Sequence, residues 1–211
     1  MAEPERKRGA DTRERLLDAA EMSILDKGFA TTSIEELIAE VGITKSGFFY
    51  HFSDKGALAK ALLERYLQRE ETLFDDLFSR ARELDDDPLH AFLIGLKLMA
   101  ELMADLPEGH PGCLVAAYCY QENMFNRDVR DLNREGVLRW RKRFRQYLDE
   151  IEERYPPRSN VNLDDLADMF SALADGGIIL SKVVRDKELL PRQLMLYREM
   201  VRTVFLGTDR H

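Results

Sequence analysis

The spacing of apolar residues constrains the fold of this chain more than any other feature. Apolar residues recur at three- and four-residue intervals along almost the whole sequence, as on one face of an α-helix. An early example is the stripe formed by Leu16, Leu17, Ala20, Ile24 and Leu25. No segment alternates apolar and polar residues between hairpin turns, as an antiparallel β-sheet would require. The sequence therefore predicts an all-α protein of about nine helices, three short ones followed by longer ones.

Capping signals predict where the helices begin and end. Asp11 and Glu14 have the spacing of a capping box and predict the start of the first helix. Ser33 and Glu36 predict the start of a second, short helix, and Thr44 can cap a third. Gly28 and Gly42 are expected to end the first two helices. Ser53 or Asp54 can cap a fourth helix that runs past residue 75. The predicted loops leave further helices near 89–105, 113–124, 128–154, 163–184 and 191–206.

The composition narrows the class of protein. The chain has 211 residues, 45% of them hydrophobic and 33% charged, which suits a globular protein with a sizeable core. No apolar run approaches the ~18–20 residues that span a bilayer, and the first residues contain no apolar signal core. Two cysteines, Cys113 and Cys119, are too few for a disulfide scaffold. We therefore expect a cytoplasmic protein that has no membrane partner.

The charge of the chain argues against non-specific coating of nucleic acid but allows binding through a local basic surface. A formal net charge of −8 argues against a protein that coats nucleic acid indiscriminately. Residues 6–15 nevertheless carry a local basic excess, from five bases and two acids (Arg6, Lys7, Arg8, Arg13 and Arg15 against Asp11 and Glu14). A restricted basic surface therefore remains compatible with the composition.

Residues 33–52 have the pattern of a helix-turn-helix. Two short helices are joined by Val-Gly-Ile, a turn of the expected length that contains glycine. On a helical wheel Phe48 and Phe52 share the core face, while Ser46 and Tyr50 point the opposite way. Gly47 costs about 1 kcal/mol relative to alanine inside a helix. That cost is understandable if another surface approaches the helix backbone closely.

Lys55 points to the same kind of surface. It falls in the first turn of the next helix, where the helix dipole disfavours a cation. An anion such as phosphate, bound by this lysine and the backbone N–H groups, would remove the conflict. From the residues alone, two interpretations remain open: a DNA-reading helix-turn-helix, or a small helical subdomain with a solvated lysine and tyrosine.

Residues of about 11–58 resemble the DNA-binding domain of the TetR family (tetracycline-repressor-like) of transcriptional regulators. The stretch that carries the resemblance is GFATTSIEELIAEVGITKSGFFYHFSDKGAL, residues 28–58. It has Gly-Phe at the end of the first helix, Thr-Thr before the second, Gly-Ile before the third, and then aromatic-x-His-Phe and Asp-Lys. Phe49 departs from the family, which often has tyrosine there, so a phosphate contact from that hydroxyl is absent.

The resemblance implies roles for individual residues. Lys45, Ser46 and Gly47 would meet base edges in the major groove, while the phosphates would be held by Thr32, Tyr50, His51 and Lys55. Ser33 and Thr44 complete the predicted DNA-binding set. It also implies a DNA-binding domain over residues 1–55, with a basic arm at 1–10, and a ligand-binding and dimerisation domain over 56–211.

The two last predicted helices are candidates for a dimer interface. Small residues at three- and four-residue spacing would let the helix at 163–184 approach another closely. This pattern also fits an intrachain core, but the resemblance favours a two-fold four-helix interface between subunits, which matches a palindromic operator. The residues predicted for it are Phe170, Ala174, Gly177, Ser181, Tyr197, Val201 and Phe205.

The middle helices are rich in bulky, adaptable side chains. Singly, such residues are typical of a core, but together they could line an apolar cavity with a few polar groups. The predicted lining is Phe74, Phe78, Leu96, Met99, Met103, Cys113, Tyr118, Trp140, Phe144 and Tyr147. By resemblance a hydrophobic or aromatic small molecule would bind there and release the DNA. The sequence does not identify this effector.

Catalytic and metal-binding patterns are missing. No GxSxG, HExxH, P-loop or dinucleotide motif occurs, so we predict no catalytic residue and no cofactor. His110, Cys113, Cys119 and Glu122 lack the spacing of metal ligands, and Cys113 suits a buried, inert thiol better than a redox or electrophile sensor. The predicted function is a homodimeric repressor that an effector releases from a palindromic operator. The alternatives are a small all-α enzyme and a helical interaction module with a vestigial DNA surface.

Overall fold

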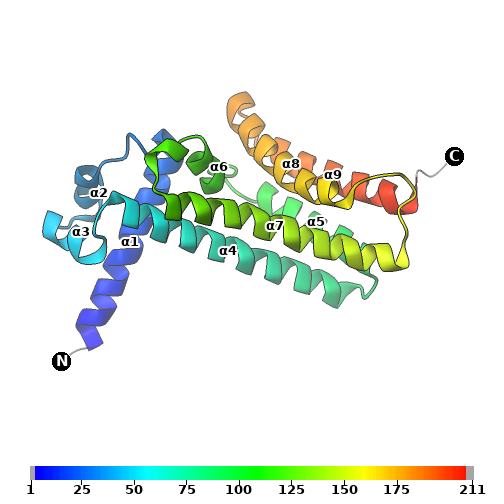
Figure 1. The fold of residues 1–211 in the computed structure, drawn as a ribbon, viewed down its shortest axis with the longest axis horizontal. Helices are drawn as coiled ribbons and strands as arrows, with labels where there is room; N and C mark the ends of the chain where they lie inside the picture. Colours follow the sequence, from blue (N-terminus) through cyan, green and yellow to red (C-terminus); the bar gives the residue numbers. More distant parts are fainter. Residues whose placement is uncertain (1–2, 208–211) are drawn as a thin grey trace. The chain divides into compact units, whose positions relative to one another are not determined.

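The computed structural model describes residues 3–207, with side chains from residue 9 onward, and within them only helices occur as regular elements (Figure 1). The all-α prediction is therefore confirmed. Nine α-helices and one short 3-10 helix make up this part of the chain: α1 (Glu3–Lys27), α2 (Ile34–Val41), α3 (Lys45–His51), α4 (Lys55–Leu84), α5 (Pro88–Ala104), α6 (Leu114–Cys119), η1 (Glu122–Met124), α7 (Arg127–Arg154), α8 (Leu163–Val184) and α9 (Leu189–Leu206).

The contacts divide the chain into two compact units. The first unit consists of residues 1–69 and 113–136, and the second of residues 70–112 and 137–211. Helices α4 and α7 each contribute residues to both units. The first unit thus extends beyond the DNA-binding domain predicted for residues 1–55, because Tyr118 and Phe125 pack near Phe29 at the end of α1.

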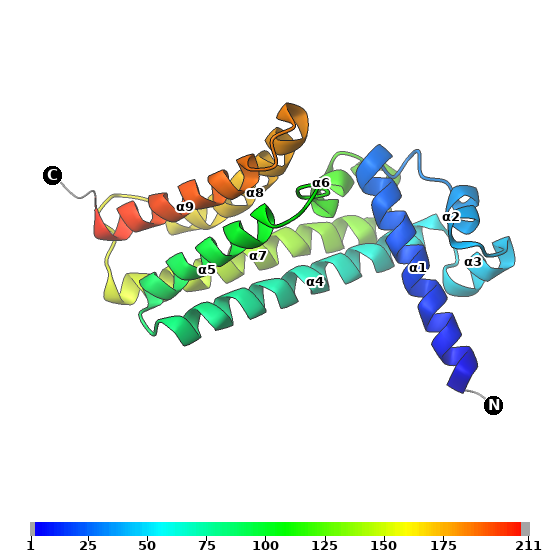
Figure 2. The same cartoon turned by 180° about the vertical axis from the view of Figure 1, so that it is seen from behind.

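The first unit is organised around α1. Helix α1 contacts α2 and α6, and α2 contacts α3 (Figures 1 and 2). Its core includes Leu16 and Leu17 of α1, Leu37 of α2, Phe48 of α3 and Leu58 of α4. Because the apolar faces of short helices are small, α2 and α6 depend on packing against α1 for burial.

Two local predictions in this unit are wrong. Helix α1 begins at Glu3 rather than Asp11, because the polar residues before Asp11 continue the helix. Residues 1–2 and the side chains of residues 3–8, which belong to the predicted basic arm, lie outside the described residues. The single helix predicted near 113–124 is divided into α6 and η1, and the backbone between them is irregular at Gln121.

The second unit packs α9 against both α5 and α8 (Figure 2). Helices α8 and α9 run side by side as a hairpin joined at residues 185–188. The boundaries match the predicted 163–184 and 191–206 closely, since Asn162 caps α8 and Arg185 ends it in the left-handed region. Among the residues that the structure describes, no helix is long and apolar enough to cross a membrane.

Candidate nucleic-acid interface

Helices α2 and α3 are fixed by the capping residues that the sequence predicted. The Ser33 hydroxyl accepts the N–H of Glu36, and the Glu36 carboxylate accepts the N–H of Ser33, which completes a capping box. The Thr44 hydroxyl accepts the N–H of Gly47 at 3.1 Å and so starts α3. Gly42 ends α2 with φ of 72°. These bonds fix the two helices as a helix-turn-helix.

The aromatic side chains of α3 and its C-cap divide as the wheel predicted. Phe48 is fully buried and Phe52 is 4% exposed, whereas Tyr50 is 82% exposed. Phe49 is also partly exposed and stands edge-on to Phe48. The face of α3 that carries Lys45, Ser46 and Tyr50 is therefore open to a partner, as DNA contact requires.

No neighbouring atom of the chain requires a glycine at position 47. A Cβ atom built there would lie 3.4 Å from Thr44 Oγ1 and 3.6 Å from Ile43 Cβ, which are ordinary contact distances. An alanine would therefore fit the described structure and favour the helix. The glycine is consistent with an external surface that approaches the backbone of α3.

The two lysines singled out in this region have different environments. The Lys45 ammonium is exposed and lies 3.0 Å from the Glu35 carboxylate on α2. The Lys55 ammonium donates to the Phe29 carbonyl and lies 4.1 Å from the centre of the Phe29 ring. Partial burial lowers the pKa of Lys55. Lys55 thus has a structural role in the free chain in addition to the phosphate contact predicted for it.

The Thr32 side chain is buried and hydrogen-bonded within its own chain, and its phosphate contact stays a prediction. Thr32 is only 1% exposed, and its hydroxyl bonds with the Ser23 hydroxyl and the Gly28 carbonyl. The physical reason is local, because these bonds satisfy polar groups at the end of α1. Ser33 and Thr44 are used as helix caps. His51 is half-buried, and its pKa is lowered by burial and by the charge of Arg13.

Sequence reasoning missed the residues that hold the turn between α1 and α2. Gln121 Oε1 accepts the Ala30 N–H at 3.0 Å, and its amide group covers Gly28 so closely that a Cβ there would lie 2.4 Å from Nε2. The Phe29 ring packs 4.5 Å from the ring of Phe125. The only sequence signal was Gly28 itself, which has φ of 86° and so favours glycine.

The predicted dimer residues have partners within their own chain. A Cβ on Gly177 would lie 3.1 Å from the Cα of Leu190, and the Ser181 hydroxyl accepts the Leu190 N–H. Tyr197 donates to the Leu166 carbonyl. Four of the seven, Phe170, Tyr197, Val201 and Phe205, are buried side chains of the single chain. Several of these residues thus pack within their own chain, and a role for the set in a dimer interface stays a prediction.

A different face of α8 and α9 is open. A Cβ atom added at Gly176 would have nothing within 4 Å, in contrast to one at its neighbour Gly177. Large apolar side chains are exposed on the same two helices, with Val183 at 76% and Leu196 at 50%. We define the open α8–α9 face by these exposed apolar residues and the glycine: Gly176, Ile179, Leu180, Val183, Val184 and Leu196.

The predicted ligand residues of the second unit form a packed ring cluster. The Phe144 and Phe170 rings are stacked at 3.8 Å, and Phe78 stacks on Tyr147 at 4.6 Å. Gly95 on α5 lets the Phe78 ring reach the helix backbone, since a Cβ there would lie 2.5 Å from the ring. Other predicted members are also buried or half-buried in this unit (Phe74, Leu96, Met99, Met103 and Trp140).

The space left beside this cluster is small. A cavity next to Phe78, Phe92 and Tyr147 measures about 10 Å³, whereas a small-molecule site usually has a volume of roughly 300–1,000 Å³. An effector at this position would therefore have to displace one or more rings.

Cys113 and Tyr118 belong to the first unit and have partners there. The Tyr118 hydroxyl donates to the Ala59 carbonyl at 2.9 Å, and burial raises its pKa. Cys113 is buried at the start of α6, where its sulfur accepts the Ala116 N–H. These two side chains are thus not part of the ring cluster. Among the described residues, no group of three or more potential ligands could hold a metal ion.

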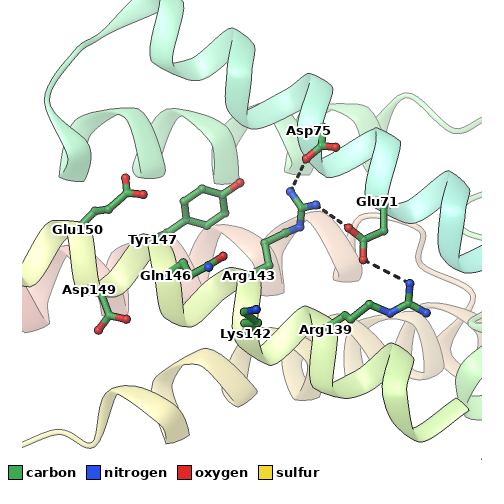
Figure 3. Close-up of a pocket in the computed structure, with 9 residues that line it drawn as sticks. All are labelled: Glu71, Asp75, Arg139, Lys142, Arg143, Gln146, Tyr147, Asp149 and Glu150. Carbon is green, nitrogen blue, oxygen red and sulfur yellow. Dashed lines mark hydrogen bonds and ion pairs between the residues drawn. The ribbon is translucent and has the colours of Figure 1, made fainter. Parts of the chain in front are cut away.

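A charged groove lies on the second unit between α4 and α7 (Figure 3). Its volume is about 660 Å³, and of the predicted ligand residues it includes only Tyr147. Arg143 bridges Asp75 at 2.6 Å and Glu71 at 2.7 Å, so its charge is already matched by carboxylates. The remaining lining is also mainly charged or polar: Arg139, Lys142, Gln146, Asp149 and Glu150.

Comparisons with known proteins agree with this geometry. Residues 16–62 match the family model "Bacterial regulatory proteins, tetR family". The repressor DhaR of a Mycobacterium species is 24% identical over 89% of this chain and 90% of its own length. The regulator TtgR of Pseudomonas putida is 24% identical over 94% of this chain and 90% of its own.

Solved structures share the fold. The regulatory protein TetR from Rhodobacter sphaeroides superposes with a TM-score of 0.71 at 23% identity, over 91% of this chain and 97% of that one. The reduced form of NemR from E. coli superposes with a TM-score of 0.75 at 21% identity, over 95% of this chain and 100% of that one.

The matched segment covers α2, α3 and the residues that cap them, and the fold shared with these solved structures covers 91–95% of the chain. The family match over residues 16–62, the curated relatives and the shared fold together support a TetR-family transcriptional regulator. Both relatives named above are regulators of transcription, and the matched segment supports a DNA-binding regulator.

Proposed function

We propose that this protein is a homodimeric repressor that binds a palindromic operator and is released from it by a small-molecule effector. The observation that carries the proposal is the open face of α3, where Lys45 and Tyr50 are exposed beside a glycine that the fold does not require. A helix of this kind can enter the major groove, which is wide enough to admit an α-helix. The expected cytoplasmic location stays a prediction.

The open α8–α9 face supports dimerisation. A patch of exposed apolar side chains around a small residue is typical of a protein–protein contact, and Val183 and Leu196 are among the most exposed apolar residues of the second unit. A second copy of the same chain is the occupant we propose. An isologous contact of this kind would pair two copies of α3 about a two-fold axis, as a palindromic operator requires.

The ring cluster of the second unit supports an apolar or aromatic effector. Phe78 packs against both Tyr147 and Phe92 and against the backbone at Gly95, so a flat ring already fits this position. An aromatic ligand could replace that ring with similar packing. The charged groove is a second candidate, although Arg143 would have to exchange Glu71 and Asp75 for ligand groups.

Selection of bound DNA from a random duplex library tests the proposed function. Purified protein should enrich an inverted repeat whose half-sites lie about one helical turn apart, or a multiple of it. Footprinting should then protect both half-sites equally. Enrichment of a single, asymmetric site, or of no sequence at all, would contradict a symmetric operator-binding dimer.

The effector is tested with the selected operator in hand. A panel of aromatic and apolar small molecules is added to the complex while DNA release and Trp140 fluorescence are recorded. Trp140 is the only tryptophan and is buried on α7, so a ligand that rearranges the ring cluster should change its emission and release DNA over the same concentration range. Release without any change in Trp140 emission would place the effector site away from the cluster.

A further inference from the structure

Two neighbouring glutamates on α2 meet lysines from different helices. Glu35 Oε1 lies 3.0 Å from Nζ of Lys45, the first residue of α3. Glu36 pairs with Lys27, the last residue of α1. The same chemical contact therefore occurs twice, one residue apart, with different surroundings.

Glu36 is part of the local structure, whereas Glu35 is not. The Glu36 carboxylate bonds to Lys27 and to the Ser33 N–H, and both bonds lower its pKa. The pKa of Glu35 is lowered by its own backbone N–H and by Lys45. In the Glu35 pair both side chains are about two-thirds exposed, at 67% and 63%. Such an exposed pair adds little to stability. The first turn of α2 favours an acidic residue at Glu35, but it does not require that residue to pair with a lysine of α3.

Glu35 lies beside a lysine that is expected to read a base. We propose that Glu35 is a specificity-determining residue. It accepts one N–H of the Lys45 ammonium, and this ion pair weakens the attraction of Lys45 to phosphates. The other N–H donors of Lys45 stay available for a guanine. This inference rests on the proposed function, since it assumes that Lys45 meets a base edge. It names a residue outside the set predicted to contact DNA.

The physical basis is the difference between phosphates and bases. Attraction to phosphates depends on net charge and makes up most of non-specific binding. The ion pair of Glu35 and Lys45 is neutral as a whole, so it gains little from a phosphate. Guanine O6 and N7 instead accept directed hydrogen bonds, and an ammonium group has three N–H donors. A carboxylate beside the lysine thus penalises the wrong partner more than the right one.

The test compares Glu35→Gln with the neighbouring Glu36→Gln on the selected operator and on random duplex DNA. Glu35→Gln should raise the affinity for random DNA about threefold and steepen its salt dependence by about one phosphate contact per subunit. Operator affinity should rise less, so the operator-to-random ratio falls. Glu36→Gln is the matched control, because it removes the same charge from the same helix. It should lower the melting temperature and leave the ratio unchanged.

A Lys45→Ala background separates the mechanisms. If Glu35 acts through Lys45, Glu35→Gln should not alter the ratio in this background. If Glu35→Gln leaves the operator-to-random affinity ratio unchanged while Lys45 is present, the inference is overturned. An equal change of this ratio with Lys45 present and with Lys45 replaced by alanine would also overturn it. If the unmodified protein does not prefer the operator at all, the proposed function itself has failed. These results are distinguishable in one set of titrations.

Discussion

The helix pairs α2–α3 and α8–α9 both contain a helix glycine, and the two glycines differ in what surrounds them. At Gly47 an added Cβ would make only ordinary contacts, the nearest at 3.4 Å. At Gly177 it would lie 3.0 Å from a side-chain atom and 3.1 Å from the Cα of Leu190. The second glycine accommodates a close approach by its own chain, and the first does not. A helix glycine thus indicates a close approach, but not whether the approaching surface is internal.

The largest effect is expected from enlarging Gly177. Gly177→Leu would push α8 away from Leu190, and overpacking of this kind costs about 1–3 kcal/mol in the free energy of unfolding. Gly176→Leu is the matched control, because the same side chain would point into open space. Its fold should be retained while the dimer dissociates more readily. Chemical denaturation and sedimentation, both at the same protein concentration, measure the two effects.

The opposite result would assign Gly177 to the dimer interface and remove Gly176 from it. If Gly177→Leu dissociated the dimer without loss of stability, and Gly176→Leu had no effect on association, Gly177 would belong to the interface. The open α8–α9 face would then be wrong as the proposed contact.

The two lysines of the first unit sharpen the comparison between internal and external partners. Lys55→Ala removes the bond to the Phe29 carbonyl, so we expect a loss of about 1 kcal/mol in stability together with weaker binding to operator and random DNA alike. Lys45→Ala should change stability by less than about 0.5 kcal/mol. It should reduce operator discrimination by about 1–3 kcal/mol.

Denaturation and salt titrations on both DNAs distinguish these two outcomes. An equal loss on both DNAs for Lys45→Ala would make it another phosphate contact rather than a base-reading residue. Full stability of Lys55→Ala would show that its contact with Phe29 is unimportant to the fold.

The helices were predictable because their signals are local. Periodicity and caps gave α8 and α9 almost to the residue, and the capping box at Ser33 and Glu36 is present. The wheel also separated buried Phe48 from exposed Tyr50, since the two faces of a short helix differ in polarity. Apolar periodicity predicts which face of a helix is buried, but it does not identify the element that packs against that face.

The sequence provided much less about the partners of individual side chains. The small residues of α8 fitted either an intrachain core or a dimer, and the structure packs Gly177 against Leu190 of α9. The Thr32 hydroxyl was predicted to hold phosphate, and in the structure it bonds with Ser23 and Gly28. Gln121 escaped notice because its contact with Ala30 joins residues 91 positions apart, which no local pattern encodes.

Gly47→Ala tests the central claim most directly, namely that the open face of α3 is shaped for DNA and not for the fold. The variant should unfold with a free energy higher by up to about 1 kcal/mol, because alanine favours the helix and meets no clash. Its affinity for the selected operator should fall, because the added methyl group stands where the DNA approaches. Equal or tighter operator binding by a stabilised variant would contradict this account of α3.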